Sequence, residues 1–481
     1  MGAYRNSALL VDGGWISADE RDCVAIENPA TGEDVGSCPI ATTGDIAAAL
    51  SAGERAFPRW STRPATERAE ILHRAAELVR ERADAIAALL TMEQGKLPDE
   101  AAVEVRGAAN HIDWMAEEGR RAYGRIVPAR GPGLRQMVLC EPIGTVAAFS
   151  PWNFPATTPA KKLSASLVAG CCCILKAAEE TPLTAVEIVK AFIEAGVPQG
   201  VIGLLTGRPA EISERLIASP VVRKISFTGS VPVGRELAAL AAAHGKPATL
   251  ELGGHAPVLV FADADLDRTA RLSVAAKFRN AGQVCVSPTR FLVDAAVCPS
   301  FIDRFVAETG KLAAAPQGEG MGPLASARRL EAVEEIVADA VAAGARVLCG
   351  GARTGNAGYG FAPTVLTDVP PTARLLQEEP FGPIAIIQPF SSESEAVARA
   401  NDTPYGLAAY AFTEDGGRRA RLGHGLQAGL VGINSFQINA PETPWGGVKD
   451  SGYGREAGSE GLAAYLTEKT VVEAFEPVPQ Q

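Results

Sequence analysis

Two residues of this 481-residue sequence have the chemistry to act together on a carbonyl group. Cys285 lies in the stretch KFRNAGQVCVSP between small, uncharged neighbours, and a cysteine thiolate is a strong nucleophile. A free cysteine is also commonly a small core residue, so this stretch alone leaves both interpretations open. Glu251, in LELGGHAP, ends an apolar run just before two glycines. The C-terminal ends of strands in α/β sheets often carry ligands and chemistry, although most glutamates are solvated or salt-bridged.

A stiff loop presents a possible oxyanion donor. In PWNFP, residues 151–155, a proline on each side restricts the backbone and reduces its conformational entropy. The side-chain amide of Asn153 would then be held rigidly and could donate to a developing negative charge. The alternative is a loop whose Trp152 and Phe154 simply pack into the core.

Two further stretches suit a nucleotide. In LKAAEET, Lys176 ends an apolar run with Glu179 three residues later, and such a pair could hold ribose hydroxyls or form a solvated turn. FTGSVPVGRE, residues 227–236, joins a strand to a helix whose N-terminus could bind a phosphate. Its glycines at 229 and 234 match neither GxGxxG nor a Walker motif, so an ordinary βα turn is the simpler interpretation.

Alternating elements would position these residues. From residue 145, short apolar runs alternate with helix-length segments, which predicts βαβ units and a parallel sheet covered on both faces. These segments are 157–169, 181–195, 210–218 and 231–243. A second alternating block follows residue 256, so two doubly wound lobes are expected. Before them, the first 120 residues predict a β start and long helices, with Gly95 as a C-cap.

The C-terminal part of the chain has a different pattern. The segment 422–458 is rich in glycine and turns, which predicts loops laid across a cleft. The final run YLTEKTVVEAF predicts an edge strand that pairs with another segment or another subunit.

Composition excludes several classes of function. The chain carries 45 basic and 56 acidic residues, a net charge of −11, which argues against a nucleic-acid partner. Its best apolar run, Leu163 to Leu175, has thirteen residues and is too short to span a bilayer. The first residues lack the basic head and apolar stretch of a signal peptide. A cytoplasmic protein without a membrane partner is therefore expected.

The cysteine and histidine spacings indicate no metal site. Nine cysteines form no CxxC, and five histidines form no HExxH. We expect free thiols in a reducing compartment, and we interpret His255 as a structural loop residue.

Seven motifs in this order resemble the aldehyde dehydrogenase superfamily along nearly the whole chain. They are PWNFP, LKAAEET, FTGS with a glycine five residues after its first, LELGG, GQVC, EEPFGP and GGVKDSGYGRE. The 34-residue spacing of Glu251 and Cys285 also resembles that family. Around Cys285 and over residues 118–130, the chain looks most like succinate-semialdehyde and 2-oxoglutarate-semialdehyde dehydrogenases.

The resemblance implies an α/β fold with two doubly wound, Rossmann-type lobes and a small β element. The implied ranges are 1–121 and 142–252 for an NAD-binding domain, 253–460 for a catalytic domain, and 122–141 with 461–481 for a bridging and oligomerisation element. It also implies a homodimer or homotetramer.

The resemblance assigns catalytic roles to five residues. Cys285 would be the nucleophile, Asn153 an oxyanion donor, and Glu251 the general base for deacylation. Lys162 and Glu456 match positions linked to proton relay in relatives.

The resemblance also assigns the cofactor. Trp152, Lys176 and Glu179 would contact adenosine, and Ser230 the pyrophosphate. Glu379 and Phe381 would contact the nicotinamide ribose. Glu179 favours NAD because a carboxylate repels a 2′-phosphate, although NADP stays open.

On the substrate side, the resemblance points to a distal carboxylate. Arg279, six residues before Cys285, would grip it, because a guanidinium fork matches a carboxylate. Lys161 stands where relatives often carry a second arginine. The alternative for Arg279 is a solvated or salt-bridged cleft arginine.

Some positions depart from the family pattern, and these leave the chain length of the substrate open. Trp445 replaces the usual phenylalanine, and the loop 435–443 matches no branch.

The expected activity is NAD-dependent oxidation of a small carboxylate-bearing aldehyde, succinate semialdehyde or 2-oxoglutarate semialdehyde. The alternatives are a broad aliphatic or aromatic aldehyde dehydrogenase, a CoA-acylating relative, and a binding protein without turnover.

Overall fold

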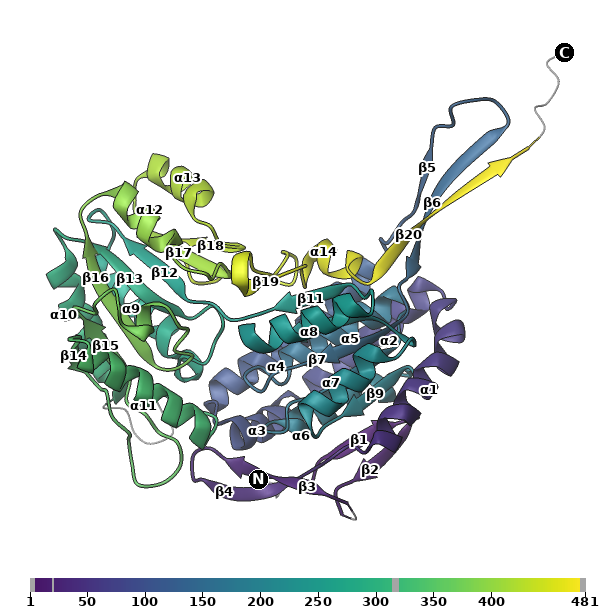
Figure 1. The fold of residues 1–481 in the computed structure, drawn as a ribbon, viewed down its shortest axis with the longest axis horizontal. Helices are drawn as coiled ribbons and strands as arrows, with labels where there is room; N and C mark the ends of the chain where they lie inside the picture. The colour runs from purple at the N-terminus through teal and green to yellow at the C-terminus, as the bar shows by residue number, and fades with distance from the viewer. Residues whose placement is uncertain (1–4, 20, 314–319, 476–481) are drawn as a thin grey trace.

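The computed structural model describes residues 5–19, 21–313 and 320–475 and shows two α/β lobes side by side with a projecting arm (Figure 1). The first lobe is built on an eight-stranded sheet and the second on a seven-stranded sheet. This is the architecture that the alternating pattern predicts.

The first sheet is parallel at its centre and antiparallel at both ends. Its order is β19 (Gly452–Tyr453), β11 (Ala248–Glu251), β10 (Val222–Thr228), β7 (Thr145–Phe149), β8 (Cys173–Lys176), β9 (Ile202–Leu205), β1 (Ala8–Val11) and β2 (Gly14–Ser17). Its helices are α1 (Thr43–Ser61), α2 (Ala65–Glu81), α3 (Ala83–Gln94), α4 (Pro98–Gly119), α5 (Thr157–Ala169), α6 (Pro182–Glu194), α7 (Pro209–Ala218) and α8 (Val231–Ala243).

Both faces of this sheet are buried, because successive side chains of a strand point to opposite faces. In β7, Val146 and Ala148 join the core cluster that contains residues of α2 to α6. Ala147 and Phe149 join the cluster that contains residues of α1, α7 and α8. Continuous apolar runs in the sequence therefore encode a central parallel strand.

The second sheet is parallel except for one edge strand. Its order is β14 (Arg346–Cys349), β15 (Thr364–Thr367), β16 (Ile384–Phe390), β13 (Pro288–Asp294), β12 (Ala256–Val260), β17 (Ala408–Phe412) and β18 (Leu430–Ile433). Its helices are α9 (Leu266–Phe278), α10 (Cys298–Ala313), α11 (Ala327–Ala342), α12 (Glu393–Asn401) and α13 (Gly416–Gly425), with short 3₁₀ turns η1 (Arg279–Gly282), η2 (Arg374–Leu376) and η3 (Lys449–Ser451).

The arm is a three-stranded antiparallel sheet that extends away from both lobes (Figure 1). It consists of β5 (Arg125–Val127), β6 (Leu134–Pro142) and β20 (Leu466–Ala474), and α14 (Gly458–Ala463) leads into it. As the sequence predicts, β20 is an edge strand, and it pairs with β6 from Leu466 to Ala474. A separate hairpin joins β3 (Cys23–Asn28) and β4 (Glu33–Pro39).

Several sequence predictions match these elements closely. The segments 157–169 and 231–243 coincide with α5 and α8, and Gly95 caps α3 with a φ of +85°. That left-handed conformation suits glycine, because other residues meet a steric penalty there. The domain boundaries stay predictions; β19, from the range 253–460, pairs with β11 of the first lobe. None of the helices in the described ranges is long and apolar enough to cross a membrane.

Candidate active site

The segment before Cys285 adopts an unusual backbone. Asn280, Ala281 and Gly282 all have positive φ angles, of 50°, 52° and 72°. A Cβ at Gly282 would lie 2.1 Å from the carbonyl oxygen of Gly382, so glycine is needed there. The turn leads to Cys285 just before the N-terminal end of β13, close enough to Glu251 and Lys161 of the first lobe for both charges to act on its pKa.

Cys285 is surrounded by groups that keep its thiol protonated. Its pKa is raised to about 12, mainly by burial and then by the nearby carboxyl groups of Glu379 and Glu251, whereas Lys161 opposes them. The thiol therefore needs a base before it can act as a nucleophile.

Glu251 has the properties of such a base. Its side chain ends β11, is 3% exposed, and neither carboxyl oxygen has a hydrogen-bond partner among the described residues. Burial raises its pKa well above the usual range, and Glu456 raises it further, while Lys161 and Lys162 oppose the shift. A carboxylate with a raised pKa is a stronger base, and its free oxygens can accept a proton.

Asn153 lies against the segment that carries Cys285. Its loop joins β7 to α5, and its side-chain amide donates to the Gln283 carbonyl at 3.0 Å. An amide nitrogen carries two hydrogens, so one donor stays available.

Lys162 and Glu456 form a buried ion pair. The Nζ of Lys162 lies 2.6 Å from Glu456 Oε1 and donates to Ser226 Oγ at 2.9 Å. Burial raises the pKa of Glu456, but Lys162 and Lys161 together outweigh it and lower the pKa below its usual value. The structure thus brings these two predicted residues together.

Lys161 is buried without such a partner. The residue is 9% exposed, its ammonium group makes no hydrogen bond to any described residue, and Nζ lies 4.5 Å from the Trp445 ring centroid. Burial lowers its pKa, against the attraction of Glu456, Glu251 and Cys285. A buried cation without an ion pair, beside Cys285, is a favourable site for an anion.

His111, on α4, is a residue of this region that the sequence motifs do not identify. It is 3% exposed, and its Nδ1 has no partner among the described residues. Burial lowers its pKa well below the usual value, and Lys161 lowers it further. The sequence signal that could have identified His111 is its position on the buried face of an amphipathic helix.

Arg279 differs from Lys161 in being exposed. Its guanidinium lies 5.8 Å from the Phe154 ring centroid, and it has no ion pair within the described part of the chain. It is neither buried nor salt-bridged, so its charge is available.

Two of the predicted adenosine residues, Lys176 and Glu179, lie at the C-terminal end of β8, and the third, Trp152, follows β7. Lys176 Nζ is 2.6 Å from Glu179, and Glu179 Oε1 accepts from the Gly207 N–H at 2.9 Å. The carboxylate is thereby fixed in place while still able to accept further hydroxyls. The Glu179 carboxylate as an acceptor and the Lys176 ammonium as a donor fit the hydroxyl groups of a ribose.

The remaining predicted cofactor residues gather near the junction of the lobes. Ser230 is exposed before the first turn of α8, and its hydroxyl makes no capping bond, which leaves donors for a phosphate. Phe381 stacks edge-on against Trp152 with centroids 5.6 Å apart. Glu379 accepts from the Gly254 N–H at 2.9 Å, and burial raises its pKa to about 7. These residues fit a nicotinamide dinucleotide.

Histidine, cysteine and carboxylate side chains form no cluster suited to a metal ion within the described ranges. His255 is buried in the interior, where its Nε2 donates a hydrogen bond to the Leu375 carbonyl at 3.1 Å.

The sequence and the fold agree on one family. Residues 15–471 match the Aldehyde dehydrogenase family. The chain belongs to this family and is an aldehyde-oxidising oxidoreductase.

Its relatives act on different compounds. TsaD1 of Comamonas testosteroni, a 4-(hydroxymethyl)benzenesulfonate dehydrogenase, is 49% identical and covers 97% of this chain and 98% of its own length. The succinate-semialdehyde dehydrogenase (NADP(+)) GabD of Escherichia coli is 42% identical, with 96% of each chain covered. The crystal structure of succinate-semialdehyde dehydrogenase from Burkholderia pseudomallei superposes with a TM-score of 0.94 at 42% identity, covering 97% of this chain and 98% of that chain.

Proposed function

We propose that the protein oxidises a small carboxylate-bearing aldehyde, succinate semialdehyde or 2-oxoglutarate semialdehyde, with NAD. The observation that carries this proposal is a pair of cations that form no ion pair with any described residue, one beside Cys285 and one six residues before it in the chain. Lys161 is buried and Arg279 exposed, and neither has an ion pair among the described residues. A substrate carboxylate supplies the missing charge.

In the proposed reaction, Glu251 takes the proton of the Cys285 thiol, and Sγ adds to the aldehyde carbon as the C=O π bond opens. The backbone N–H of Cys285 and the free amide hydrogen of Asn153 hold the resulting oxyanion. A nicotinamide held by Glu379 and Phe381 would supply the acceptor for the hydride of that carbon, and Cys285 would then carry an acyl thioester.

Hydrolysis then needs Glu251 as a base again. We assign to the Lys162–Glu456 pair the relay that passes the first proton of Glu251 on to solvent, because both charges of the pair act on the pKa of Glu251. Glu251 next takes a proton from water, the water oxygen attacks the thioester carbon, and the C–S bond breaks to release the acid and the thiolate. Because Glu251 supplies this water, coenzyme A is not required as an acceptor.

We assign the cofactor as NAD because the Glu179 carboxylate accepts ribose hydroxyls and repels a 2′-phosphate. Comparing the kcat/KM of NAD with that of NADP tests this choice. A Glu179→Gln variant should narrow the difference between the two cofactors.

A second candidate is an aromatic aldehyde that carries a sulfonate. The 49% identity to TsaD1, whose name specifies a benzenesulfonate, favours it. The Lys161 ammonium over the Trp445 ring also suits it, since an ammonium is a point charge without the fork that matches a carboxylate.

The test is initial-rate NAD reduction with four aldehydes: the two semialdehydes, 4-formylbenzenesulfonate and butyraldehyde. A kcat/KM for a semialdehyde well above the other two supports the first assignment, and a preference for the sulfonate supports the second. If butyraldehyde matches or exceeds the anionic aldehydes, the substrate is instead a general aldehyde and the charged-substrate proposal is wrong.

Arg279→Ala sharpens this comparison. We expect it to lower kcat/KM for the preferred anionic aldehyde about 100-fold while changing butyraldehyde by less than about threefold. Arg271→Ala is the matched control, because Arg271 is an exposed arginine of α9, the helix that ends just before Arg279. Equal losses on both substrate classes would contradict a clamp at Arg279.

We also propose that the β5–β6–β20 arm joins subunits into a dimer or tetramer. Its edge strand β20 has free hydrogen-bonding groups, and it carries the exposed apolar residue Val472. Sedimentation of the protein before and after truncation at residue 465 tests the assembly.

A further inference from the structure

The side chain of Asn280 lies between the two loops that carry Asn153 and Cys285. Its Nδ2 donates to the Asn153 carbonyl at 3.2 Å and to the Gln283 carbonyl at 3.3 Å. Asn280 is 3% exposed and lies five residues before the nucleophile. One amide therefore bridges the oxyanion loop of the first lobe and the nucleophile loop of the second.

The orientation of this amide is set by a neighbour on α3. Gln94 Nε2 donates to Asn280 Oδ1 at 2.9 Å, and Gln94 is fully buried. Because Oδ1 accepts this bond, Nδ2 must point toward the two carbonyls. Reversing the amide would place a carbonyl oxygen against two others, which is unfavourable.

The backbone at this point is held as tightly as the side chain. Asn280 has φ +50° and ψ +37°, a left-handed conformation that asparagine tolerates better than most residues. Its N–H donates to both carboxyl oxygens of Glu100, at 3.1 and 3.2 Å. A left-handed residue with its backbone and side chain both bonded is a fixed point of the turn.

The oxyanion loop is fixed from the same corner of the fold. Lys96 Nζ donates to the Asn153 carbonyl at 3.0 Å and forms a buried ion pair with Glu104. Glu104 Oε1 in turn accepts from the Ala156 N–H at 2.9 Å. The Asn153 carbonyl thus receives two donors, from Lys96 and Asn280, one for each lone pair.

We infer that Asn280 is a positioning residue that sets the placement of Asn153 relative to Cys285, with Gln94 and Lys96 orienting the two sides. The inference rests on the proposed roles of Asn153 and Cys285 and does not depend on the identity of the aldehyde. It predicts that Asn280 acts on turnover through Asn153.

The test is a double-variant cycle on kcat with Asn280→Asp and Asn153→Ala. Asn280→Asp keeps the size and the left-handed tendency but places an oxygen against the two carbonyls. We expect it to lower kcat about 100-fold on semialdehyde and butyraldehyde alike, the scale of losing one oxyanion donor. In the Asn153→Ala background, the same change should cost less than about threefold.

Two companion variants separate the side chain from the backbone. Asn280→Gly keeps the left-handed turn without strain and removes the amide, so kcat should still fall by at least tenfold. Gln94→Glu replaces the donor that orients Asn280 and should show the same non-additivity with Asn153→Ala. Thr309→Val, which removes a buried hydroxyl bonded only within α10, controls for a general loss of stability.

The inference is wrong if the double variant loses kcat by the product of the two single-variant losses. It is also wrong if the kcat of Asn280→Asp stays within threefold of wild type. If Asn153→Ala alone leaves kcat unchanged, the oxyanion role fails and the inference fails with it. The two proposals fail in different ways. The carboxylate proposal is tested by the ratio of kcat/KM between anionic aldehydes and butyraldehyde, whereas a positioning defect lowers kcat on all aldehydes alike. NAD binding and the rate of Cys285 alkylation, measured on each variant, give readouts that do not need turnover.

Discussion

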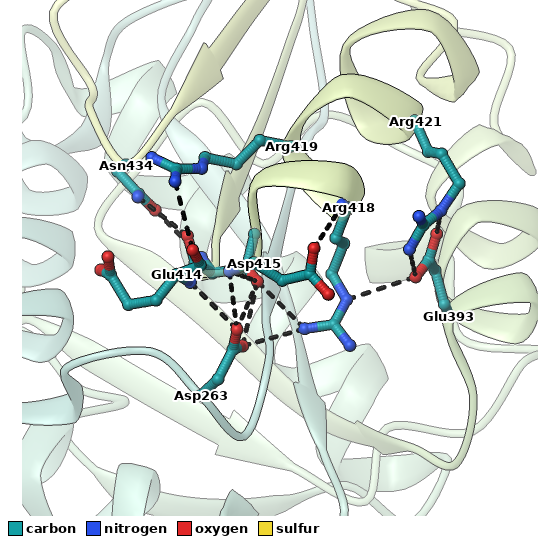
Figure 2. Close-up of polar contacts among 9 residues, drawn as sticks. Asp263, Glu393, Glu414, Asp415, Arg418, Arg419, Arg421 and Asn434 are labelled. Carbon is teal, nitrogen blue, oxygen red and sulfur yellow. Dashed lines mark hydrogen bonds and ion pairs between the residues drawn. The ribbon is translucent and has the colours of Figure 1, made fainter.

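Two polar clusters border the sheet of the second lobe, one of them shared with Glu251 and Lys161 of the first lobe, and they differ in how many of their hydrogen bonds are made. Cys285 precedes β13, at the N-terminal edge. Asp263 follows the parallel strand β12, at the opposite edge, where it meets the segment after β17 and the start of α13 (Figure 2).

The Asp263 cluster is saturated. Asp263 Oδ2 accepts from the Thr413 hydroxyl at 2.8 Å and from the N–H groups of Glu414 and Asp415 at 3.0 Å, and Oδ1 accepts from Arg418 at 2.9 Å. Burial raises the pKa of Asp263, but the Thr413 hydrogen bond, the Asp415 N–H and Arg418 outweigh it, so the pKa falls below its usual value. Each donor stabilises the charged form.

In the candidate active site, the buried charged groups of Glu251 and Lys161 lack the hydrogen bonds that the Asp263 cluster has. Glu251 is more deeply buried than Asp263, yet its oxygens have no partner among the described residues, and its pKa is raised. The ammonium group of Lys161 likewise lacks a hydrogen bond in the described part of the chain. Buried polar groups without partners are costly, so a protein that keeps them uses them with substrate or solvent. The contrast separates a structural cluster from a chemical one.

The largest effect that tests this contrast is expected at Glu251. Glu251→Gln should lower kcat about 10²- to 10⁴-fold, because the base for thiol activation and deacylation is lost. In the wild type, the fraction of Glu251 that is deprotonated increases as pH rises through its raised pKa. The kcat should therefore increase with pH over a range that lies above the ordinary glutamate value of 4.5. The measurement is a pH–rate profile with unfolding controls, and an unchanged limb in the variant would contradict the role of Glu251.

A smaller effect, with opposite signs for stability and activity, is expected at Lys161. Lys161→Met removes a buried charge without an ion pair, so the free energy of unfolding should rise by about 1 kcal/mol. At the same time kcat/KM for an anionic aldehyde should fall at least about tenfold.

The adjacent Lys162 is the matched control for that stability change. Lys162→Met leaves Glu456 buried and unpaired, and should cost about 3–5 kcal/mol in chemical denaturation. Equal stability changes at the two lysines would show that the difference in pairing does not matter.

The smallest effect is expected at the saturated cluster. Asp263→Asn weakens several charge-assisted bonds on a side chain that is 35% exposed, so unfolding should cost about 1–2 kcal/mol less. Because the folded pKa is below the unfolded value, this contribution is present at neutral pH and is lost as pH falls below about 4. Activity at neutral pH should not change, and a loss of kcat would break the distinction between the two clusters.

Local sequence patterns predict much of the fold because their physical causes are local. The prolines of PWNFP, the βα alternation from residue 145 and the C-cap at Gly95 each depend on neighbours within a few positions. The motifs around Cys285 and Glu251 likewise identify the family from residue types and order.

Other features depend on residues far apart in the chain and were not visible in the motifs. Asn280 contacts Gln94 and Asn153, which are 186 and 127 residues away. His111 is a single histidine on a helix until folding places it near Lys161.

The sequence by itself determined the family, the two-lobe α/β architecture and the residue types available for aldehyde oxidation, because strand and helix periodicity and motif order are properties of the chain. Only the tertiary structure decided which buried charges are paired. Lys161 and Lys162 are neighbours in sequence, but only Lys162 reaches Glu456. Pairing depends on which side chains the two lobes bring within hydrogen-bond distance, and no local pattern encodes that distance.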